Sequence, residues 1–136
     1  MNTDKQYALI TGATSGIGLE LAKLFVKDNY NLVIVARDEE ELANAASTLR
    51  SAAEVEIITI SKDLFKKESA AEIYQQLKEQ GVQIDVLVND AGQGVYGKFA
   101  DNDIERELDI IQLNICSVVS LTKLSIRILF LLIFSQ

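Results

Sequence analysis

The residues best suited to chemistry lie in one short turn, Thr11 to Gly18, which reads TGATSGIG directly after the apolar run YALI. Glycine permits positive φ at a turn, and its missing Cβ lets backbone N–H groups approach a pyrophosphate closely. A helix that begins inside the turn adds unpaired donors and a partial positive charge. A tight turn without a ligand is the alternative. The residues predicted to hold the pyrophosphate are Gly12, Thr14, Ser15, Gly16, Ile17 and Gly18.

A second candidate site residue follows the next apolar run, NLVIVA, where Arg37 precedes Asp38. In a dinucleotide site, the residue at the end of this strand contacts the adenosine ribose. The planar guanidinium of arginine matches the geometry of a 2′-phosphate, whereas an acidic residue would bond a free 2′-OH. The pair therefore favours NADP(H), with NAD(H) as a possible cofactor. A surface ion pair of Arg37 with Glu39 or Glu41 is the alternative.

Composition excludes several other kinds of site. The 136 residues include no histidine and one cysteine, Cys116, which excludes a Ser–His–Asp triad, an internal disulfide and an ordinary zinc site, so we expect no metal. The net charge of −7 argues against nucleic acid as a partner. No signal peptide is visible at the N-terminus, which indicates a cytoplasmic protein.

The elements that must position these residues alternate between short β-branched runs and helical patterns. Strands are expected at 6–11, 31–36, 54–61 and 85–89, and helices at 16–29, 39–51, 68–80 and from Ile104 onward. In the first helix, Ile17, Leu21, Leu24 and Phe25 are expected to lie on one face. This alternation predicts an α/β fold with a Rossmann-like parallel sheet of strand order 3-2-1-4. Residues 1–136 are expected to form a single dinucleotide-binding domain.

Further motifs follow in a recognisable order: KDL with Asp63, NDAG from Asn89 to Gly92, and Asn114 in the last helix. Together with TGATSGIG they resemble the short-chain dehydrogenase/reductase family, whose members are NAD(P)-dependent oxidoreductases acting on CH–OH donors. The resemblance implies that Asp63 holds the adenine amino group beside Leu64. It also implies that Asn89, Ala91 and Gly92 line the cofactor, and that Asn114 supports a proton-relay water.

The sequence departs from the family pattern in two ways. Asp90 stands where the family usually has a second asparagine. In addition, the serine, tyrosine and lysine of the family's catalytic region are absent, because the chain ends 22 residues after Asn114. The one Tyr-x-x-x-Lys match, Tyr74 with Lys78, lies on an earlier helix and is expected to be a surface pair. Tyr96, in the loop after NDAG, is expected to pack on the sheet.

We therefore expect a truncated cofactor-binding domain with little or no activity of its own. An oxidoreductase completed by another chain is a second hypothesis. A third is a non-enzymatic interaction subunit that uses the open edge of the fourth strand and the apolar C-terminal helix. Residues 125–136 form an atypical apolar tail, expected to be buried or covered by a partner rather than to span a membrane. Exposed apolar surface of this kind favours a homo-oligomer or pairing with another chain.

Overall fold

A computed structural model describes residues 5–134 of the chain, with side chains described as far as Ile126. Its centre is a four-stranded sheet in the order β3-β2-β1-β4, and every neighbouring pair is parallel. The predicted α/β fold and strand order are confirmed. The strands are β1 (Tyr7–Thr11), β2 (Asn31–Ala36), β3 (Ile57–Ser61) and β4 (Val86–Asn89).

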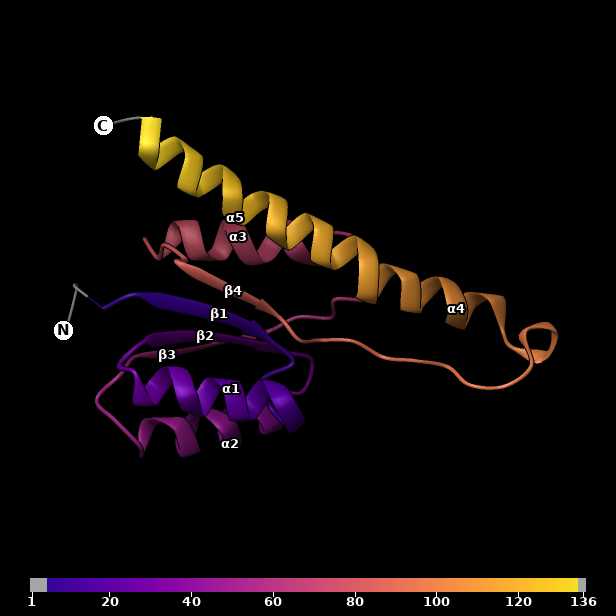
Figure 1. Cartoon of the computed structure of the whole chain (residues 1–136), viewed down its shortest axis with the longest axis horizontal. Helices are drawn as coiled ribbons and strands as arrows, with labels where there is room; N and C mark the ends of the chain where they lie inside the picture. Colours follow the sequence, from indigo (N-terminus) through magenta and orange to yellow (C-terminus); the bar gives the residue numbers. More distant parts are fainter. Residues whose placement is uncertain (1–4, 135–136) are drawn as a thin grey trace.

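Helices cover both faces of the sheet, as Figure 1 shows. On one face lie α1 (Gly16–Lys27) and α2 (Glu39–Arg50), and on the other lie α3 (Ser69–Glu79) and α5 (Ser117–Phe134). The helix α4 (Ile104–Ile111) continues into α5 through a π-helical segment, Gln112–Cys116, and projects beyond the sheet. A 3₁₀ turn, Phe99–Asp101, lies in the long connection between β4 and α4.

The two faces of the sheet bury two separate apolar clusters. Ala8, Ile10 and Ile34 pack with α1 and α2, whereas Leu9, Val33 and Ile60 pack with α3 and α5. Residues Leu32 to Val35 of β2 are fully buried, which explains their unbroken β-branched and aliphatic run. β3 is shorter than predicted and begins at Ile57, because Glu54 to Glu56 precede the ladder with β2.

The apolar face of α1 is only partly buried, with Phe25 packed against the core. The helix buries Gly18, Ala22 and Val26, whereas Ile17 and Leu24 are 73% and 56% exposed. Small residues at a spacing of four bring the helix backbone close to the sheet, which larger side chains would prevent. Apolar periodicity does not identify this packing face, because glycine and alanine contribute little hydrophobicity but allow a helix to approach a sheet closely.

The loop after β4 also differs from expectation. Tyr96 and Phe99 are 95% and 80% exposed, so Tyr96 does not pack on the sheet. The loop runs beside α4, beyond the ends of the strands, where no sheet surface is available to it (Figure 1). Tyr96 follows β4 by only a few residues in the sequence, but its ring lies in solvent rather than on the sheet.

The long C-terminal helix packs on α3 through a narrow strip. Leu121 is fully buried, and the hydroxyl of Ser125 is hydrogen-bonded to that of Tyr74 on α3. Burial raises the pKa of Tyr74, and its hydrogen bond with Ser125 partly opposes that shift. The segment Ile104–Ile126, with a mean hydropathy of 1.3, has the length and composition of a membrane span, a test that core helices of soluble proteins also pass. Most of the expected tail at 125–136 lies outside the described part of the structure, which includes no side chain after Ile126 and neither of the last two residues.

Candidate functional site

A cleft of about 550 Å³ opens at the carboxyl ends of the four parallel strands. This edge is where ligands bind in open α/β sheets, because loops and helix N-termini converge there. Six of the predicted cofactor residues line the cleft: Gly12, Thr14, Arg37, Leu64, Ala91 and Gly92. Ser15, Gly16, Ile17, Gly18, Asp63 and Asn89 are not among its lining residues.

The glycine turn is shaped by the close approach of three chain segments. Gly12 has a φ of +69°, and its N–H donates to the carbonyl of Val35 over 2.9 Å. A Cβ on Gly12 would stand 3.0 Å from the backbone of Ala91, and one on Gly18 would stand 2.2 Å from the carbonyl oxygen of Gly12. Gly16 has a φ of +56° with open space around it, so it serves the turn through its backbone conformation alone.

The N-terminus of α1 keeps its donors available. Its N-cap residue, Ser15, makes no side-chain capping bond, and the first turn carries no acidic residue. Ser15, Gly16 and Ile17 are all exposed, so this end of the helix is open to solvent. An uncapped helix N-terminus presents unpaired N–H groups and a partial positive charge, which suits a phosphate.

Thr11, the first residue of the TGATSGIG motif, joins the two central loops. Its buried hydroxyl oxygen accepts hydrogen bonds from the N–H groups of Asp90 and Ala91, at 3.1 and 3.0 Å. These bonds hold the end of β4 against the start of the glycine turn. A hydroxyl residue at the last position of β1 was the available signal for this role.

Arg37 lies on the rim of the cleft next to an aromatic ring. Its guanidinium carbon is 5.1 Å from the ring centroid of Phe65. The ion pairs among the described side chains are Lys23 with Glu20 and Lys62 with Glu72, so the pairing of Arg37 with Glu39 or Glu41 is not found. Asp38 instead caps α2 by accepting from the N–H of Glu41 over 2.9 Å, as its position predicts.

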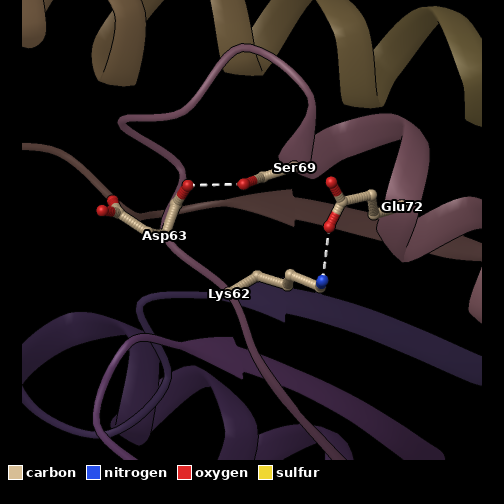
Figure 2. A network of polar contacts seen from close by, with 4 residues as sticks. All are labelled: Lys62, Asp63, Ser69 and Glu72. Atoms are coloured by element: carbon tan, nitrogen blue, oxygen red, sulfur yellow. Dashed lines mark hydrogen bonds and ion pairs between the residues drawn. The ribbon is translucent and has the colours of Figure 1, made fainter.

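Asp63 organises the turn that follows β3. Its carboxylate accepts from the N–H of Phe65 over 3.0 Å, and its carbonyl oxygen accepts from the hydroxyl of Ser69. Figure 2 shows the Asp63 carboxylate pointing away from the neighbouring pair of Lys62 with Glu72. The turn places Leu64, which is 5% exposed, on the wall of the cleft.

The loop after β4 is held to the last helix by Asn114. The side-chain nitrogen of Asn114 donates to the carbonyl of Gln93 over 2.7 Å, and its side-chain oxygen accepts from the N–H of Gln93 over 3.0 Å. Asn114 lies in the π-helical segment, where the wider turn is common near functional sites. Asn89 donates to the hydroxyl of Thr122 over 3.2 Å and so faces α5 rather than the cleft.

Several side chains around the cleft were not predicted from the sequence. Arg106, from α4, lies 5.5 Å from the centroid of Phe65 and donates to the side-chain oxygen of Gln93. No local motif marks these positions, because they meet only through the fold. The lining residues that were not predicted to contact a cofactor are Val35, Ala36, Asp38, Glu41, Lys62, Phe65, Gln93 and Leu113.

The tyrosine of the Tyr-x-x-x-Lys match lies away from the cleft. Tyr74 is buried between α3 and α5, so the expectation of a wholly exposed pair is wrong for Tyr74, while Lys78 is exposed. No tyrosine is found among the cleft's lining residues in the part of the chain that the structure describes.

Comparisons with known proteins agree with this geometry. The chain matches the family model described as short chain dehydrogenase over residues 6–131. It is 33% identical to the very-long-chain 3-oxoacyl-CoA reductase of Schizosaccharomyces pombe, over 90% of this chain and 37% of that protein. It is 36% identical to a putative ketoacyl reductase of Streptomyces coelicolor, over 88% of this chain and 46% of that protein.

A solved structure shares the same fold. The L-sorbose reductase from Gluconobacter frateurii, complexed with NADPH and L-sorbose, superposes with a TM-score of 0.85 at 28% identity, over 90% of this chain and 47% of that one. The chain spans about half the length, or less, of the curated relatives it matches.

Proposed function

Because the chain belongs to the short-chain dehydrogenase family, we propose that its cleft binds a nicotinamide dinucleotide, NADP(H) in preference to NAD(H). One observation carries the proposal: the glycine turn, Arg37 and Leu64 border a single cleft at the carboxyl ends of the strands. The L-sorbose reductase complex with NADPH supports the choice of cofactor. We treat residues 1–136 as one dinucleotide-binding domain.

The proposed contacts divide along the cofactor. The turn from Gly12 to Gly18 and the N-terminus of α1 receive the pyrophosphate through backbone N–H groups. Arg37 pairs with the 2′-phosphate, with its guanidinium already oriented beside Phe65. Asp63 and Leu64 bind the adenine. Ala91 and Gly92 continue along the cofactor towards its nicotinamide, with Asn114 holding the loop in place. Asn89 faces α5 and supports this segment through its bond to Thr122.

The reaction that this function implies is hydride transfer between NADP(H) and a carbonyl or alcohol. Two relatives are named as reductases of oxoacyl or ketoacyl compounds, which favours carbonyl reduction. The cofactor supplies the hydride, and this chain's residues bind and orient it. We propose little or no turnover by the chain alone, because general acid catalysis contributes about 10²–10⁴-fold and no residue in the cleft matches the family's tyrosine acid.

Titration of the purified chain with NADPH and NADH tests this function. We expect saturable NADPH binding with a dissociation constant about tenfold or more below that of NADH, because the 2′-phosphate adds a charge-assisted bond. Fluorescence of the bound nicotinamide measures both dissociation constants. Carbonyl reduction by a homogeneous preparation would contradict the proposed inactivity, and equal failure of both nucleotides to bind would contradict the cofactor assignment.

We also propose that the chain self-associates in the cytoplasm through α4, the π-helical segment and α5. Apolar side chains at spacings of three, four and seven form one exposed stripe, the C-terminal seam. Its members are 46–61% exposed. They are Ile104, Leu108, Ile111, Ile115, Val119 and Ile126.

A charge in the seam should dissociate this oligomer. We expect Ile115→Lys to shift the mass measured by light scattering from oligomer towards monomer, because an unpaired charge in an apolar interface is costly. Leu24→Lys is the matched control, since Leu24 is 56% exposed on α1, away from the seam. A monomeric parent chain, or a mass unchanged by Ile115→Lys, would contradict the assignment of this surface.

A further inference from the structure

The carboxylate of Asp90 lies directly beneath the glycine turn. One of its oxygens is 2.6 Å from the position that a Cβ on Gly18 would occupy, and 3.3 Å from the corresponding position on Gly12. The side chain therefore occupies space that these two glycines leave open. Its backbone is fixed there, because the N–H of Asp90 donates to the buried hydroxyl of Thr11.

This carboxylate has no compensating partner among the described side chains. The hydrogen bonds of Asp90 include one from its backbone N–H and none to its carboxylate, and the two ion pairs of the described part lie elsewhere. The carbonyl oxygen of Gly12 points into the same space, 2.2 Å from the Cβ position of Gly18. Two acceptors thus face one region without a donor between them, and the residue is half-buried.

The uncapped N-terminus of α1 lies beside this carboxylate. Gly18 lies in the first turn of α1, and that turn carries no acid of its own. A carboxylate next to Gly18 therefore acts on the same partial positive charge that attracts a pyrophosphate. In the ligand-free protein, the negative charge of Asp90 therefore reduces the positive electrostatic potential at the N-terminus of α1.

We propose that Asp90 sets the affinity of the glycine turn for pyrophosphate, weakening it through its negative charge. The inference rests on the proposed cofactor function and concerns the strength of that one contact. Asparagine at this position would remove the charge and supply an N–H donor for the Gly12 carbonyl. Both changes stabilise the turn with its ligand.

The test compares the chain with Asp90→Asn and Asp90→Ala, titrated with NADPH, ADP-ribose and 2′-AMP. We expect both variants to bind NADPH and ADP-ribose about five- to twentyfold more tightly, because a nearby like charge is removed. Binding of 2′-AMP, which lacks the pyrophosphate, should change less than about twofold. The gain should shrink between about 20 mM and 500 mM NaCl, as screening requires.

Asp101→Asn provides the matched control, because this exposed aspartate lies in the 3₁₀ turn, outside the cleft. Tighter binding of the pyrophosphate ligands by both Asp90 variants, with this control unchanged, supports the inference. Unchanged affinity, or an equal gain for 2′-AMP, overturns it while leaving the cofactor proposal intact. If neither the parent chain nor any variant binds NADPH, the cofactor proposal fails and this inference fails with it.

Discussion

Gly18→Ala is expected to destabilise the protein by about 2–3 kcal/mol and to abolish measurable NADPH binding. A Cβ at this position would lie 2.2 Å from the carbonyl oxygen of Gly12, which belongs to the backbone and cannot rotate away. Relief requires α1 to separate from the glycine turn, and that separation dismantles the pyrophosphate contacts. Urea unfolding followed by circular dichroism measures the stability, and nicotinamide fluorescence measures the binding.

Gly16→Ala is the matched control within the same turn. Its φ of +56° disfavours alanine, but no atom lies within 4 Å of the added Cβ. We expect a loss of about 1 kcal/mol from the left-handed conformation alone. If Gly18→Ala were no more destabilising than Gly16→Ala, the close packing of α1 on the glycine turn would be contradicted.

Arg37→Asp should invert the preference between the two dinucleotides. We expect the dissociation constant for NADPH to rise about 30- to 100-fold, because a charge-assisted bond is lost and a like charge faces the 2′-phosphate. NADH binding should be retained or improved, since a carboxylate at this position can accept from the free 2′-OH. Parallel fluorescence titrations with both nucleotides measure the two constants.

Lys98→Asp makes the same change of charge at an exposed residue outside the cleft. It should leave the ratio of the two constants within about twofold of the parent value. An Arg37→Asp variant that still prefers NADPH would refute the assignment of the 2′-phosphate to Arg37. Arg106 and Lys62 would then be the cations to examine, because both lie beside the cleft.

The sheet and its order were accessible from the sequence because they depend on local patterns. Runs such as NLVIVA are apolar without alternation, as a strand buried on both faces requires, and β2 occupies the predicted residues 31–36. The capping interaction of Asp38 with Glu41 is local in the same way, since it joins residues three positions apart. Motif order then led to the family, which the match over residues 6–131 confirms.

Which side chains pack in the core was harder to predict from the sequence, because burial depends on how closely two elements approach. The apolar pattern placed Ile17 and Leu24 on one face of the helix, yet α1 packs through Gly18 and Ala22, and Ile17 and Leu24 are exposed. Tyr96 was expected on the sheet, and the loop instead carries it into solvent. In each case, the burial of the side chain depends on where the neighbouring backbone lies rather than on how apolar the side chain is.

What the sequence determined by itself is the order of the strands, the place of the glycine turn and the family. What only the tertiary structure decided is which distant groups meet at the cleft. Arg37 and Arg106 flank Phe65, Thr11 joins two loops, and Asp90 lies under Gly12 and Gly18. Periodicity and motifs are set by neighbours along the chain, whereas these contacts arise because parallel strands bring their carboxyl ends to one edge.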